Sequence, residues 1–170
     1  LESLGYQFQL PRVVASARLE RSRIQLLQGH AEASRDELER ASDPAIWTPI
    51  SHLRLLSSDL EYPMLARLRW EMLAGNAAEA LEGLDRELAA AIAERRHHRA
   101  LKLRLLRTVA LAGCGDRPGA LAGLQEALEF CHREGFLRIV VDEGPALGAL
   151  VRQLAMRQPP AAAAAHEPAF

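Results

Sequence analysis

The chain has 170 residues, of which 49% are hydrophobic but only 5% are aromatic, and its formal net charge is −1. This length fits one domain with a substantial core. The scarcity of aromatic residues argues against a β-sandwich and favours closely packed helices built on Leu, Ala and Val. A net charge near zero argues against a domain that binds nucleic acid by itself.

The spacing of apolar residues predicts a series of helices in chain order. Residues 42–50 are expected to form a loop in which Asp43 caps a turn, and Pro63 is expected to follow a break near Tyr62 in an otherwise helical stretch over residues 51–74. The run from Ile139 to Val141 favours a strand but is too short and isolated for a sheet. The predicted helices span residues 11–28, 31–41, 63–74, 77–95, 99–112 and 119–134, with a last one starting at Pro145.

A repeated glycine turn organises these helices. Gly75 opens the pattern G-N-x-x-x-A-L and Gly115, about 40 residues later, opens G-D-x-x-x-A-L, while Gly29 begins a weaker copy. Repeats of this length are typical of stacked helix pairs. The sequence therefore predicts an all-α, tetratricopeptide-like α-α superhelix of stacked antiparallel helix pairs, in which the small residues Ala80 and Ala120 allow neighbouring backbones to approach.

Two segments follow from this pattern. Residues 1–157 are expected to form one helical-repeat domain, and residues 158–170, with a Pro-Pro pair and a run of alanines, a flexible linker or tail. Cys114 and Cys131 have no metal-binding spacing and are expected to be free thiols in a cytoplasmic protein. The sequence has neither a span long enough to cross a membrane nor a visible signal peptide.

Motifs that carry chemistry are absent from the sequence. It has no phosphate-binding glycine loop, nucleophile elbow or zinc-helix motif, so we assign no catalytic, cofactor-binding or metal-binding residues and expect no enzyme activity. Glu94 and His98 have a spacing that permits a shared metal or an ion pair, but a solvated polar face is the preferred interpretation. Asp142 and Glu143 are neighbours that could act as an acid–base pair; we prefer a structural role beside a helix N-terminus, with Arg138 paired to Asp142.

One candidate groove emerges from the repeat prediction. The first helices of stacked pairs often line a concave surface, and such a surface here would carry Arg69, Trp70, Arg104 and Arg107. Arginines with an aromatic residue can hold a small anionic or sugar-like ligand, or a peptide. The alternatives are that Trp70 belongs to the core and that the arginines are solvated or paired with glutamates.

Much of the chain resembles a known family. Residues 135–144 (G-F-L-R-I-V-V-D-E-G) resemble the G-[YF]-x-R-x-F-x-D-E-G element of large ATP-dependent LuxR-type transcriptional regulators, the MalT-like group. The family has Phe where this chain has Val140. Residues 120–128 (A-L-A-G-L-Q-E-A-L) resemble the helix before that element, and residues 65–81 resemble an L-A-R…L-x-x-G-x-x-x-E-A-L run upstream of it. The resemblance covers residues 59–157 well and residues 1–58 loosely.

The resemblance implies a function and a set of partners. Such regulators combine an N-terminal P-loop ATPase, a helical-repeat sensor and a C-terminal helix-turn-helix, and this chain is similar to the sensor alone. It is expected to bind a small-molecule inducer or a protein partner, to contact the other domains of its parent regulator, and to form homo-oligomers, with no cofactor, nucleic acid or membrane bound by this segment itself. The alternatives are a free-standing tetratricopeptide-like interaction module and, less favoured, an enzyme on an all-α scaffold.

Overall fold

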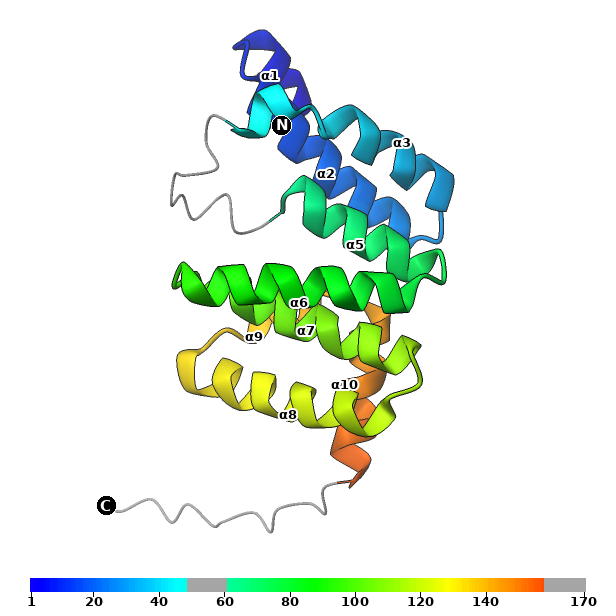
Figure 1. Cartoon of the computed structure of the whole chain (residues 1–170). Helices are drawn as coiled ribbons and strands as arrows, with labels where there is room; N and C mark the ends of the chain where they lie inside the picture. Colours follow the sequence, from blue (N-terminus) through cyan, green and yellow to red (C-terminus); the bar gives the residue numbers. More distant parts are fainter. Residues whose placement is uncertain (49–60, 158–170) are drawn as a thin grey trace, which may run out of the picture.

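A computed structural model describes residues 1–48 and 61–157, which form ten α-helices arranged in successive layers (Figure 1). These ranges contain no β-strand, which confirms the prediction of an all-α fold. The helices are α1 (Glu2–Gln7), α2 (Pro11–Leu27), α3 (Ala31–Ala41), α4 (Pro44–Trp47), α5 (Pro63–Leu73), α6 (Ala77–Ala93), α7 (His97–Gly113), α8 (Arg117–Glu134), α9 (Leu137–Asp142) and α10 (Pro145–Arg157).

Six of these helices form three stacked pairs. α2 packs on α3, α5 on α6, and α7 on α8. A short turn joins the two helices of each pair (Figure 1). α5 contacts both α2 and α3, and α6 contacts α7, so neighbours in sequence are also neighbours in space. The predicted stack of helix pairs is therefore confirmed, whereas its winding into a superhelix stays a prediction.

The repeated glycines end the first helix of each pair, as predicted. Gly29, Gly75 and Gly115 have φ angles of +81°, +91° and +85°, a left-handed conformation that glycine adopts at little cost. In each turn the amide of the residue after the glycine donates to a carbonyl five residues earlier, which closes a Schellman motif. These bonds run from His30 to Gln25 (2.9 Å), from Asn76 to Glu71 (3.0 Å) and from Asp116 to Leu111 (3.0 Å).

The turn between α6 and α7 repeats this geometry without a glycine. Arg95 has a φ of +57°, and the Arg96 amide donates to the Ala91 carbonyl at 2.8 Å. The predicted helix over residues 77–95 therefore ends at Ala93, and the next helix begins at His97 rather than Arg99. A non-glycine residue in this conformation carries no sequence signal, so the boundary could not be placed from composition.

Three short helices differ from the sequence-based expectations. The predicted loop contains α4 at residues 44–47, although Asp43 does cap it by accepting from the Ala45 amide at 2.9 Å. The strand-favouring run lies inside helix α9, where Ile139 is buried. α1 was not predicted at all. The expectations for residues 49–60 and for the tail after Arg157 lie outside the described residues.

The core is divided among the interfaces of the stack. One cluster joins α5, α6 and α7, a second joins α7 and α8 to α9 and α10, and a third joins α2, α3 and α5. Ala80 and Ala120 are completely buried, as expected for close helix approach. α5 and α6 come still closer at Gly83, where a Cβ atom would lie 2.4 Å from the side chain of Leu68.

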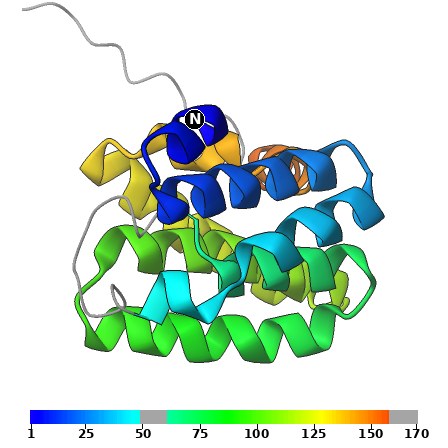
Figure 2. The ribbon, with the colours of Figure 1, turned by 90° about the horizontal axis from the view of Figure 1, so that it is seen from above.

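The C-terminal helices return to one side of the stack. Seen from above, α6 (green) lies at one edge of the molecule, and α9 and α10 (yellow to orange) lie at the opposite edge beside α2 (Figure 2). α10 packs on α7 and α8. The α9–α10 segment thus covers the side formed by α2, α5 and α7. None of the described helices has the length and apolar character needed to span a membrane.

Candidate functional site

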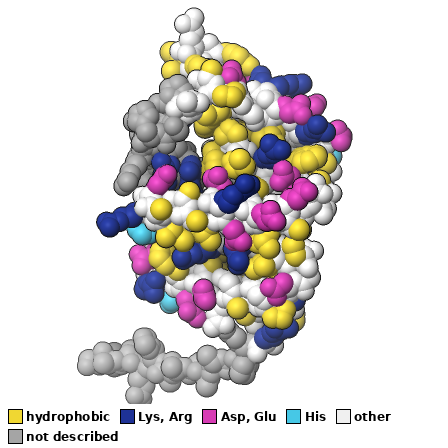
Figure 3. All heavy atoms as spheres, viewed as in Figure 1, with side chains coloured by type: hydrophobic (Ala, Val, Ile, Leu, Met, Phe, Trp, Pro, Cys, Tyr) yellow, Lys and Arg dark blue, Asp and Glu magenta, His cyan; other side chains and the backbone are white. Residues whose placement is uncertain are grey.

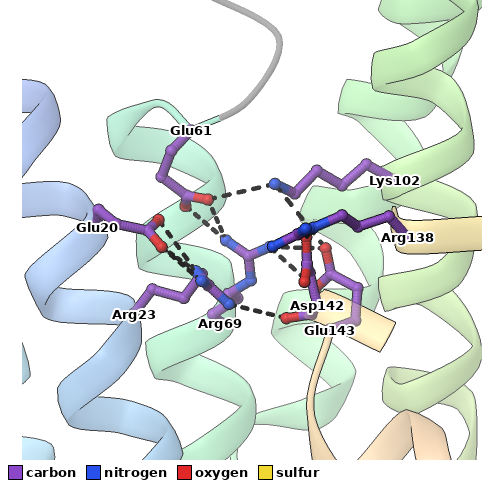
Figure 4. Close-up of polar contacts among 8 residues, drawn as sticks. All are labelled: Glu20, Arg23, Glu61, Arg69, Lys102, Arg138, Asp142 and Glu143. Carbon is purple, nitrogen blue, oxygen red and sulfur yellow. Dashed lines mark hydrogen bonds and ion pairs between the residues drawn. The ribbon is translucent and has the colours of Figure 1, made fainter. Parts of the chain in front are cut away.

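A buried cluster of charged residues lies where α9 meets the helix stack. Arg69 from α5, Glu61 just before α5, and Glu143 just after α9 have side chains that are 8%, 7% and 3% exposed. Lys102 from α7 completes the cluster (Figure 4). Charged groups are rarely buried to this degree unless they are paired. The ion pairs among these four residues are therefore what holds the cluster together.

Arg69 is the centre of the cluster. Its Nη2 donates to both carboxylate oxygens of Glu143, at 3.0 and 2.9 Å, and its Nη1 donates to both oxygens of Glu61, at 2.6 Å for Oε1. Burial alone lowers the pKa of Arg69, but the charges of Glu61 and Glu143 outweigh it and raise the pKa above its ordinary value. Arg69 is therefore a permanent cation that joins α5 to the end of α9.

Lys102 neutralises the rest of the cluster. Its Nζ lies 3.6 Å from an oxygen of Glu61 and 3.9 Å from an oxygen of Glu143. Among the described residues, two cations thus face two carboxylates, and their charges balance. Because both carboxylates accept hydrogen bonds from Arg69, this arrangement suits positioning of helices rather than proton transfer to a substrate.

A second set of contacts ties α2 to the same segment. Arg23 Nη1 donates to the backbone carbonyl of Asp142, 119 positions away in sequence, at 2.8 Å, while its Nε bonds Glu20 at 3.0 and 3.1 Å (Figure 4). A cation at the C-terminal end of α9 satisfies one of the carbonyls that a helix leaves unpaired there. The hydrogen bond to Glu20 raises the pKa of Arg23, although burial opposes it.

The turn between α9 and α10 also contacts the end of α2. Gly144 has a φ of +89°, and a Cβ atom at this position would lie 2.4 Å from the Leu27 side chain. A glycine here permits both the backbone turn and the close approach. The first helix pair and the C-terminal segment are therefore in direct contact at Arg23 and at Leu27.

These contacts border a pocket of about 420 Å³. It lies among α2, α5, α7 and the start of α10, and its charged lining residues are Arg23, Arg69, Asp142 and Glu143. This volume falls within the usual range for small-molecule sites, which are mostly apolar with a few polar groups. Its apolar walls include Leu26, Leu27, Met72, Leu106, Val109 and Ala146.

The four residues of the predicted groove lie in different places. Arg69 borders this pocket but is fully engaged by glutamates, in line with the alternative that the arginines are paired. Arg107 is also paired, since its Nε lies 2.6 Å from Asp85 on α6. Arg104 is exposed, and neither it nor Arg107 lines a pocket among those described.

Trp70 belongs to a second hollow of about 580 Å³ between α3 and α5. Its indole nitrogen donates to the Ala31 carbonyl at 3.1 Å, and its ring packs against the α2–α3–α5 core while Arg35 lies 5.6 Å from the ring centre. Trp70 is thus only partly buried but packs against the core, which is closer to the alternative that it is a core residue than to a groove shared with the three arginines. Hydrophobic side chains gather over α3 and α5 on the face in Figure 3, bordered by charged ones.

The members of the two other candidate pairs each have a different partner in the structure. The Glu94 carboxylate lies 2.7 Å from Arg96 Nε, while His98 packs edge-on against Phe136, with their ring centres 5.7 Å apart. The described residues contain no group of three or more His, Cys, Asp or Glu side chains placed to hold a metal ion. Arg138 lies 3.4 Å from Asp142, as predicted, but the buried partnership of Glu143 was missed.

Little in the sequence could have revealed this partnership. Glu143 and Arg69 are 74 positions apart, and both are residue types that usually lie on solvated faces. The one available signal was that Lys102 is the only lysine among 21 basic residues. Such a signal does not identify a partner.

Comparisons with known proteins give no match. No protein-family model matches the chain, and neither curated proteins nor solved structures yielded a significant match. The resemblance to LuxR-type regulators therefore remains an expectation based on residues 59–157.

Proposed function

We propose that this chain is the signal-sensing helical-repeat domain of a LuxR-type transcriptional regulator, and that its signal is a small molecule bound in the pocket beneath the α9–α10 turn. The observation that carries this proposal is the composition of the pocket wall. One side comes from the helix stack, through α2, α5 and α7, and the other comes from the C-terminal segment. An occupant would therefore contact two parts of the molecule at once.

A ligand in this position would bias the arrangement of the C-terminal segment. In its present, closed arrangement the segment is held by three contacts. Arg69 bonds Glu143, Arg23 donates to the Asp142 carbonyl, and Leu27 packs against Gly144. A compound that contacts both walls binds this closed arrangement more tightly than an open one, and differential affinity of this kind is what shifts a conformational equilibrium. The element that carries the family resemblance, residues 135–144, is the same element that closes the pocket.

A thermal-shift screen of sugars, amino acids, nucleotides and apolar metabolites tests the binding step. A compound at a hundred times its dissociation constant stabilises its site by about 2.7 kcal/mol, which for a chain of this size corresponds to roughly 5–10 °C. The Ala146→Phe variant fills the rim of the pocket and should abolish the shift. Ala149→Phe is the matched control, because Ala149 is exposed on the same helix and does not line the pocket.

Two results would contradict the proposal. One is a library in which no compound stabilises the wild-type chain. The other is a hit that stabilises Ala146→Phe as much as the control. The regulator assignment has its own test in the gene, where a Walker loop encoded upstream and a helix-turn-helix encoded downstream are required.

A free-standing peptide-binding module is the second candidate, and one observation favours it. The hollow between α3 and α5 has a volume of about 580 Å³, and Met64 in its lining is 42% exposed. Arg35 and Arg67 border it with Glu39 and Glu71, so a peptide of mixed charge would fit. Capture of a stable peptide partner that is lost in Met64→Glu, together with no small-molecule shift, would favour this alternative.

A further inference from the structure

From the pocket beneath the α9–α10 turn we infer the chemical class of its ligand: a neutral, predominantly apolar small molecule rather than an ion or a polyol. This inference rests on the proposed function and deepens it. It differs from the anionic or sugar-like ligand that the arginines suggest in the sequence. The reason is the way in which the charged residues of the pocket are already occupied.

Every charged side chain that borders the pocket has a partner within the protein. Arg69 donates from both terminal nitrogens to Glu61 and Glu143, and Arg23 bonds Glu20 and the Asp142 carbonyl. The carboxylate of Asp142 lies 3.4 Å from Arg138 at the surface. An anionic ligand would have to displace a carboxylate from an arginine, and removing one partner from a buried ion pair is strongly unfavourable.

The balance of charge around the pocket leads to the same conclusion. Within the part of the chain that the structure describes, Arg23, Arg69 and Lys102 carry three positive charges, and Glu20, Glu61 and Glu143 carry three negative charges, so these six charges balance (Figure 4). A cationic or anionic ligand would enter with a charge that the network does not offset. Burying an uncompensated charge against apolar walls opposes binding.

A polyol such as a sugar is expected to bind weakly for a related reason. Its hydroxyl groups exchange hydrogen bonds with water for hydrogen bonds with the site, and unmatched groups lose affinity. The guanidinium and carboxylate groups that could supply those bonds are engaged with one another. What the pocket offers a ligand is the apolar surface of Leu26, Met72, Leu106, Val109 and Ala146.

A matched set of probes tests the inference on the wild-type chain. 1-Octanol, octanoate and octylammonium share one apolar chain and differ in head-group charge at pH 7, and glucose is a neutral polyol. Each is titrated while the methyl signals of Leu26, Met72, Leu106 and Val109 are followed by NMR. We expect octanol to shift these signals with a dissociation constant at least tenfold lower than that of octanoate or octylammonium, and glucose to leave them unchanged.

The two pocket variants separate the possible outcomes. The octanol shifts should persist in Ala149→Phe and disappear in Ala146→Phe. If octanoate, octylammonium or glucose binds equally well or better and is also lost in Ala146→Phe, the ligand class is wrong and the pocket stands. If no probe shifts the pocket methyl groups, or if binding survives in Ala146→Phe, the pocket itself is wrong and the proposed function falls with it.

Discussion

Arg69 and Glu143 are 74 positions apart in the chain, yet one nitrogen of the Arg69 guanidinium holds both carboxylate oxygens of Glu143, at 3.0 and 2.9 Å. Both side chains are almost completely buried. This contact joins the middle helix pair to the segment that leads into α10. The position of the C-terminal helix therefore depends on an ion pair in the interior as well as on apolar packing.

Loss of Arg69 should destabilise the fold strongly. Arg69→Met leaves the carboxylates of Glu61 and Glu143 buried with Lys102 as their remaining cation, and such a change typically costs about 3–5 kcal/mol. Arg67→Met is the control on the same helix, because Arg67 makes an exposed ion pair with Glu71 whose loss costs less than about 1 kcal/mol. Urea unfolding followed by circular dichroism compares the two, and equal losses would contradict a buried network.

Removing both members of the pair should cost less than the sum of the two single changes. In Arg69→Met combined with Glu143→Leu, Glu61 and Lys102 remain as a balanced pair 3.6 Å apart. We expect the double-mutant cycle to give a coupling energy of about 1–3 kcal/mol. Additive losses would mean that the two residues act independently despite their contact.

Replacing Arg95 by glycine should stabilise the protein. Arg95 is exposed and has a φ of +57°, a conformation that costs a non-glycine residue roughly 1 kcal/mol or more. Arg95→Gly should therefore raise the free energy of unfolding by about 1 kcal/mol. The same substitution at Arg86, inside α6, should lower it by a similar amount. A stabilising effect at both positions, or at neither, would count against the turn geometry described for this site.

Tyr62 should make the fold sensitive to alkaline pH. Burial, followed by the charge of Glu87, raises the pKa of the Tyr62 phenol above its usual value of about 10. Its hydroxyl donates to Glu87 at 2.9 Å, and Arg99 lies 4.0 Å from the centre of the ring. A pKa that is higher in the folded state gives stability that is present below about pH 10 and is lost as the pH rises further.

The measurement for Tyr62 is the free energy of unfolding between pH 8 and 11.5. Tyr62 contributes a fall of up to about 1.4 kcal/mol per pH unit above pH 10, and Tyr62→Phe removes this contribution. Tyr6→Phe, at an exposed tyrosine in α1, is the control and should keep the alkaline fall. Identical profiles for the wild type and Tyr62→Phe would show that the phenol does not ionise with unfolding.

The parts of the fold that could be predicted are those with a local cause. Gly29, Gly75 and Gly115 mark turns because a residue without a Cβ atom takes a positive φ at little cost, and this rule acts within a few residues. Arg95 adopts the same turn without that signal, so the boundary between α6 and α7 was misplaced. The turn there is maintained by the helices on either side, whose packing the local sequence does not reveal.

The same distinction explains α9 and the buried cluster. Ile139, Val140 and Val141 favour a strand individually, but Ile139 is buried in the core with α7, α8 and α10, and tertiary packing overrides the local preference. Once α9 is a helix, Glu143 falls beside Arg69. Because this contact depends on the path of the whole C-terminal segment, sequence spacing could suggest helices and turns but not the site between them.

Hydrogen–deuterium exchange with and without a saturating concentration of a compound from the screen tests most directly whether the pocket controls the C-terminal segment. The account predicts slower amide exchange in α9, in α10 and in the second half of α2, with no change in α3, and loss of that protection in Ala146→Phe. Protection confined to α3 and α5, or a bound compound that leaves α9 and α10 unchanged, would contradict it.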